Sequence, residues 1–129
     1  MANGREPEDR VDLARLLGRD YWLIRSIPNA GTDQDAVAAR VEEHVGWLLG
    51  LEEQGVLLAS GPLLSGPGTG PGSGVTIIRA ADEETARKIA DGDPFVRHGL
   101  RTHQLYRWRL NEGSVGVRIS LGTGTYHWQ

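Results

Sequence analysis

The segment from Gly61 to Gly74 constrains the fold of this chain most, because it contains six glycines and three prolines. Such a composition disfavours helix and strand alike, so the segment is predicted to be a loop. Val56 to Ser60 before it and Val75 to Arg79 after it are short apolar runs typical of strands. The loop therefore joins two strands.

A strand and an amphipathic helix precede this pair. Tyr21 to Ile27 is rich in aromatic and β-branched residues and predicts a strand that ends at Pro28-Asn29. Thr32 is the expected N-cap of a helix, with Asp35 following in the manner of a capping box. Gly55 is expected to end that helix. Its apolar face recurs at helical spacing through Val37, Val41, His44, Leu48 and Leu51.

A second helix and a further strand follow the loop. Asp82 is expected to cap a helix that runs through Ala90 and ends at Gly92, with a single turn from Pro94 to His98 after it. Gln104 to Leu110 alternates as a strand does. The order β-α-β-β-α-β predicts an α+β fold of the ferredoxin-like, split βαβ type, with an antiparallel sheet and both helices on one face. We expect a second copy of the chain to cover the other face.

We expect the chain to comprise one domain with two extensions. Residues 1–20 form an N-terminal arm that is expected to be helical and to stop at Gly18. Residues 21–110 form the α+β domain, and residues 111–129 form a C-terminal extension with one more strand, from Val115 to Leu121.

The composition excludes several functional classes. A net charge of −3 argues against nucleic acid or an anionic membrane as the main partner. The absence of cysteine removes disulfides and thiolate chemistry. No apolar run approaches the length of a membrane span, so the expected location is the cytoplasm. The glycine-rich segment has no lysine of a phosphate-binding loop, and His98 and His103 lack regular ligand spacing. We therefore expect neither a cofactor nor a metal.

His44 and Asp93 are the candidate catalytic residues. A histidine on the apolar face of a helix needs a partner if it is buried, although a half-exposed ring that merely packs explains it as well. Asp93 precedes Pro94 and is explained equally by an N-cap role. The predicted fold places both on the same side of the sheet. A carboxylate bonded to one ring nitrogen would leave the other nitrogen for a substrate.

Three motifs give the chain a resemblance to a known family. The helix histidine His44, the segment Leu51 to Leu63 (LEEQGVLLASGPL) and the segment Asp91 to Leu100 (DGDPFVRHGL) resemble the YciI-like, or YCII-related, family. The resemblance extends from about Tyr21 to Leu110. It implies a dimeric α/β barrel of two ferredoxin-like sheets, so a homodimer or a higher homo-oligomer is expected.

The resemblance also implies an active site. It assigns a His–Asp pair to His44 and Asp93, and a cleft lining to Ser60, Gly61 and Pro62. We add Phe95, from the Asp-Pro-Phe motif, as a further substrate-binding candidate.

Some members of this family resemble enzymes that act on hydroxylated or chlorinated ring compounds, and related barrels host isomerases and cofactor-free monooxygenases. The resemblance therefore implies a cofactor-independent lyase, dehydrochlorinase or isomerase for a small cyclic or hydroxylated aromatic metabolite. Two alternatives stay open: a non-catalytic ligand-binding or interaction module, and a cofactor-free monooxygenase.

Overall fold

The structure is a computed structural model that describes residues 10–129. It contains two compact units, one spanning Asp20–Arg109 and the other combining the described residues up to Arg19 with Leu110–Gln129. Among the described residues, no helix has the length and apolar character needed to cross a membrane.

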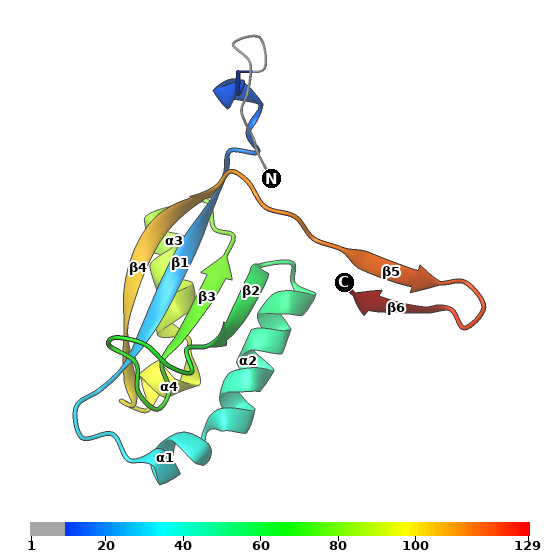
Figure 1. Cartoon of the computed structure of the whole chain (residues 1–129). Helices are drawn as coiled ribbons and strands as arrows, with labels where there is room; N and C mark the ends of the chain where they lie inside the picture. Colours follow the sequence, from blue (N-terminus) through cyan, green and yellow to red (C-terminus); the bar gives the residue numbers. More distant parts are fainter. Residues whose placement is uncertain (1–9) are drawn as a thin grey trace. The chain divides into compact units, whose positions relative to one another are not determined.

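The larger unit is built on a four-stranded antiparallel sheet with the order β2-β3-β1-β4 (Figure 1). Its strands are β1 (Arg19–Pro28), β2 (Leu57–Pro62), β3 (Gly74–Ile78) and β4 (Arg101–Leu110). Each predicted strand is present, and the order of elements is the predicted ferredoxin-like one. Gly61 and Pro62, which were assigned to the loop, extend β2 instead, because they pair with β3 opposite Val75 and Gly74.

One face of the sheet carries the core. The register aligns Trp22 with Ile78 and Ile24 with Thr76, so these side chains share a face. Ile24 and Ile78 are almost fully buried and form a cluster with Ala86 and Ala90 of the helix behind them. Figure 1 shows this helix, α3 (Glu83–Asp91), behind the sheet.

The opposite face of the sheet is also apolar. The rings of Tyr21 and Trp108 lie 6.3 Å apart there, and the Arg79 guanidinium lies over Tyr21. Tyr106 on β4 remains 47% exposed. At the end of the same strand pair, Asp20 accepts hydrogen bonds from two β4 arginines, Arg107 and Arg109.

The helix after the loop matches its prediction. Helix α3 (Glu83–Asp91) begins after Asp82, whose carboxylate accepts from the Thr85 N–H at 2.8 Å, and it ends at Gly92. A four-residue helix, α4 (Pro94–Arg97), follows with Asp93 as its N-cap.

The helix before the loop differs from its prediction. It is two helices, α1 (Gln34–Ala38) and α2 (Val41–Glu53), with a break at Ala39–Arg40. Thr32 is not the N-cap: its hydroxyl donates to the Asn29 carbonyl, and Asp33 caps α1 by accepting from the Asp35 N–H. Gly55 does end α2, at φ +73°. The bonds Gly55 N–H to Glu52 and Val56 N–H to Leu51 form a Schellman motif there.

The smaller unit holds the two ends of the described chain. A short 3₁₀ helix, η2 (Leu13–Arg15), is the helical part of the N-terminal arm within residues 10–19; the start of the predicted arm helix lies outside the described residues. The predicted C-terminal strand is β5 (Val117–Ser120), which is shorter than expected. It pairs antiparallel with β6 (Thr125–Trp128), a strand that the sequence analysis did not predict.

Candidate active site

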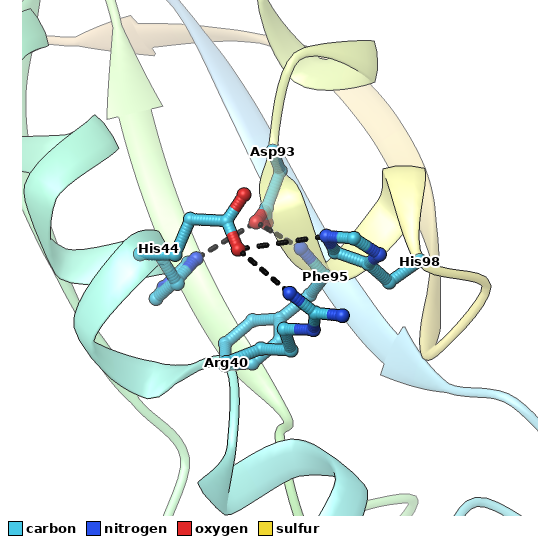
Figure 2. Close-up of polar contacts among 6 residues, drawn as sticks. Arg40, His44, Asp93, Phe95 and His98 are labelled. Atoms are coloured by element: carbon cyan, nitrogen blue, oxygen red, sulfur yellow. Dashed lines mark hydrogen bonds and ion pairs between the residues drawn. The ribbon is translucent and has the colours of Figure 1, made fainter.

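His44 and Asp93 are in direct contact. His44 lies in the first turns of α2, and Asp93 lies at the junction of α3 and α4. The His44 Nδ1 and Asp93 Oδ1 atoms are 2.8 Å apart (Figure 2). Both side chains are largely shielded from solvent, with exposed fractions of 13% and 6%. A carboxylate at this distance accepts the Nδ1–H of the imidazole and thereby fixes the ring orientation.

The Asp93 carboxylate also caps α4. The same Oδ1 atom accepts the Phe95 N–H at 2.9 Å. Pro94 at the first helical position suits this arrangement because it has no N–H of its own to satisfy. Asp93 therefore both caps α4 and pairs with His44. The cap holds the carboxylate in place for the imidazole.

Aromatic rings hold His44 on its other sides. The Phe95 ring stacks on the imidazole with a centroid separation of 4.3 Å and an interplanar angle of 29°. The Trp47 ring lies 5.9 Å away. Phe95 is almost completely buried, so the face of the imidazole that it covers is dry. Within residues 10–129, no group makes a hydrogen bond to His44 Nε2.

His44 lines a pocket of about 410 Å³. The wall is mostly apolar where it is formed by α1 and α2, and it is polar where β2, β3 and the end of the glycine-rich loop contribute. The Ser60 and Thr76 hydroxyls, 2.9 Å apart on neighbouring strands, belong to the polar part. The lining also includes the other sequence-predicted binding residues: Gly61, Pro62 and Phe95. Asp93 lies behind His44 and is not part of the pocket wall.

Arg101 is a lining residue that the sequence analysis did not single out. It begins β4, is 9% exposed, and its guanidinium Cζ lies 4.0 Å from the centroid of the Phe95 ring. Burial lowers the pKa of the guanidinium from its ordinary value, and the nearby Asp93 carboxylate acts in the opposite direction. Arginine remains a cation even so. In the sequence Arg101 is one of thirteen arginines, and no local pattern distinguishes it from the others. Its place in the site is recognisable only once the chain is folded.

A surface network ties α2 to α4 beside the pair. The Glu43 carboxylate lies 3.4 Å from the Arg40 guanidinium and 3.5 Å from His98 Nε2 (Figure 2). These groups are about half exposed, so each contact contributes little to stability. His103 contacts Asp91 instead, at 2.7 Å. His98 and His103 thus have separate acidic partners.

The chain matches a known protein family over most of its length. A family model for the YCII-related domain matches residues 22–109. The chain belongs to the YCII-related family. No curated protein matches it significantly.

A solved structure shows the same fold. It is 5-chloro-2-hydroxyhydroquinone dehydrochlorinase (TftG) from Burkholderia phenoliruptrix, in complex with 2,5-dihydroxybenzoquinone. The two proteins are 22% identical, with a TM-score of 0.56, over 68% of this chain and 92% of the dehydrochlorinase. The match confirms the predicted ferredoxin-like α+β fold of the family.

Proposed function

We propose that this protein is an acid/base enzyme of the lyase, dehydrochlorinase or isomerase type, acting on a small hydroxylated or cyclic ring compound without a cofactor. The observation that carries the proposal is the 2.8 Å contact between His44 and Asp93 at the wall of a largely apolar pocket. The dehydrochlorinase of similar fold, with its bound dihydroxybenzoquinone, suggests the substrate class.

In this proposal His44 moves the proton and Asp93 positions it. The Nδ1–H of the neutral imidazole donates to the Asp93 carboxylate, which leaves the lone pair on Nε2 as the base. Nε2 takes a proton from the ring compound, and the carboxylate stabilises the imidazolium that results. In an isomerisation the proton then returns to another atom of the substrate. In an elimination the leaving group departs with its bonding electron pair, as chloride does, and the imidazolium gives its proton to water.

The pocket wall supports a flat, mostly apolar substrate. Val37, Val41 and Leu48 supply apolar surface, while Ser60 and Thr76 supply hydroxyls at the opposite wall. A hydroxylated ring matches such a division, because its faces are apolar and its edge makes hydrogen bonds.

A screen of ring compounds tests the proposal. The panel contains chlorinated and unchlorinated hydroquinones, catechols and lactones, with chloride release, absorbance and oxygen uptake as readouts. We expect turnover of at least one compound without oxygen uptake. His44→Gln is expected to lower that rate about 10²–10⁴-fold. His127→Gln is the matched control, because His127 is an exposed histidine on β6 of the smaller unit.

Two results would contradict the proposal. An active compound whose turnover is the same in His44→Gln would remove His44 from the chemistry. Oxygen uptake that depends on His44 would instead point to a monooxygenase. If the pair were only a structural brace in a binding module, His44→Ala would lower Tm strongly and no compound would be turned over.

The apolar face of the sheet suggests how the protein assembles. Tyr21, Tyr106 and Trp108 lie on the face opposite α3, where residues 10–129 supply no helix. We propose that a second copy covers this face, which would make the protein a homodimer.

A further inference from the structure

Arg101 is a buried cation at the start of β4. Its side chain makes no hydrogen bond or salt bridge to any group in the described part of the chain, although it is only 9% exposed. The Nε atom is fully buried and has no partner. Burying a charge in this state is costly, so such groups are generally paired or held for a ligand.

The pocket supplies no acidic side chain to balance this charge. Among the described residues, the lining contains Arg101 and His44 but neither aspartate nor glutamate. Asp93 acts on Arg101 through space, but its Oδ1 already accepts two hydrogen bonds elsewhere. A negatively charged ligand would therefore meet a cation without displacing a competing carboxylate.

The glycine-rich loop makes room for the guanidinium. Gly72 has a φ of +88°, and a Cβ built on it would lie 2.8 Å from Arg101 Nε and 3.2 Å from Nη2. Any other residue at this position would push the guanidinium out of its place. The loop thus packs its backbone against the cation, and Gly72 also lines the pocket.

We propose that Arg101 and the Gly72 end of the loop form an anion subsite, and that the ligand is a planar ring carrying a phenolate, enolate or carboxylate oxygen. This inference deepens the proposed function, because it names the charge of the substrate. Arginine recognises such oxygens with paired N–H groups in one plane.

The Phe95 ring sets the distance between the subsite and the proton-transfer group. It contacts the His44 imidazole at 4.3 Å and the Arg101 Cζ at 4.0 Å. A single substituted aromatic ring is therefore long enough to reach both the His44 imidazole and the Arg101 guanidinium. An anionic oxygen held at Arg101 would place another atom of the same ring near His44. Arg101 would also stabilise negative charge that develops when that proton leaves.

Matched pairs of probes test the subsite by calorimetric titration. Benzoate and benzamide have the same shape but differ in charge, and 2,5-dihydroxybenzoquinone is compared with its dimethyl ether. We expect each anion to bind at least tenfold more tightly than its neutral counterpart. Arg101→Gln is expected to weaken anion binding about 10–100-fold and to leave binding of the neutral compounds within twofold. The two pairs together show whether a carboxylate or a ring oxygen is preferred.

A pair of loop variants tests the same subsite with Arg101 in place. Gly72→Ala places a methyl group against the guanidinium and is expected to abolish the preference for anions. Gly66→Ala is the control for backbone strain, because Gly66 also has a positive φ, of +121°, with no other atom within 4 Å of the added Cβ. These two variants keep the test decisive if Arg101→Gln does not fold. Removal of an unpaired buried cation is expected to leave Tm unchanged or higher.

Equal affinity for an anion and its neutral counterpart in both pairs would overturn the subsite. So would an unchanged preference in Arg101→Gln, or no binding of either anion at millimolar concentration. Failure of the anion subsite can be told apart from failure of the proposed function, because His44→Gln is expected to keep the preference for anions and to lose turnover. Anion preference with turnover independent of His44 would sustain the subsite and reject the acid/base role.

Discussion

Substitution of Asp93 separates its charge from its hydrogen bonds. Because a single oxygen, Oδ1, accepts both the His44 Nδ1–H and the Phe95 N–H, the amide oxygen of Asp93→Asn can accept both bonds without the charge. Asparagine caps helices about as well as aspartate does. We therefore expect Asp93→Asn to change the free energy of unfolding by less than about 1 kcal/mol.

The rate should respond more strongly than the stability. A hydrogen bond to a charged group contributes about 1.5–3 kcal/mol, against about 0.5–1.5 kcal/mol for a neutral one. The imidazolium formed during proton transfer loses that difference in Asp93→Asn. A loss of about 1–1.5 kcal/mol in the transition state corresponds to a rate that is about 5–13-fold lower.

Asp93→Ala removes both bonds and provides the contrast. Loss of the cap costs about 1 kcal/mol. The largely buried Nδ1–H of His44 then has no acceptor, which costs about a further 1–3 kcal/mol. Asp82→Ala measures the cost of a lost cap alone, because Asp82 caps α3 without a histidine partner.

Urea unfolding followed by tryptophan fluorescence, together with turnover of the best compound from the panel, provides the two readouts. The reasoning fails if Asp93→Asn is as unstable as Asp93→Ala while its turnover is unchanged. Asp93 would then be a helix cap and nothing more.

Three further predictions concern the scaffold. The pKa of Asp20 is lowered from 3.8 to about 2 by hydrogen bonds from its two arginine partners on β4. Its contribution to stability should therefore be complete above pH 4 or so and disappear as the pH falls to about 2, so acid unfolding curves of wild type and Asp20→Asn should converge there. Gly55→Ala should destabilise the protein by about 1–2 kcal/mol, because its φ of +73° is left-handed. Gly50→Ala within α2, with open space around the added Cβ, should instead stabilise the protein by about 0.8–1 kcal/mol in the same urea titration. Light scattering should give the mass of a dimer for wild type and that of a monomer for Tyr106→Glu, which places a charge on the apolar sheet face; a dimeric variant would exclude this face as the interface.

Periodicity and capping rules predicted most of the larger unit. The four strands, α3 with its Asp82 cap and the end of α2 at Gly55 all follow from local patterns. The break at Ala39–Arg40 has no such signal, because neither residue type disfavours a helix. The choice between Thr32 and Asp33 as N-cap was similarly undetermined, since both residue types are good caps.

The site was predictable only in part. His44 and Asp93 stood out because a titratable residue on an apolar face and an aspartate before a proline are local patterns. Arg101 opens a strand and resembles the other arginines in the sequence. Its place against Phe95 and Gly72 depends on residues six and twenty-nine positions away, so only the folded chain shows it. Strand β6 was missed although it had local signals, because a turn with Gly122 and Gly124 precedes it and Thr125 to Trp128 contains residue types that favour strands.

The tautomer of His44 tests the central claim most directly, and nitrogen-15 NMR of the imidazole measures it without a known substrate. We predict that at neutral pH the proton of the neutral ring lies on Nδ1, where Asp93 accepts it, and that adding 2,5-dihydroxybenzoquinone shifts the Nε2 resonance. A ring protonated on Nε2, or an Nε2 resonance that does not respond to the compound, would contradict the account.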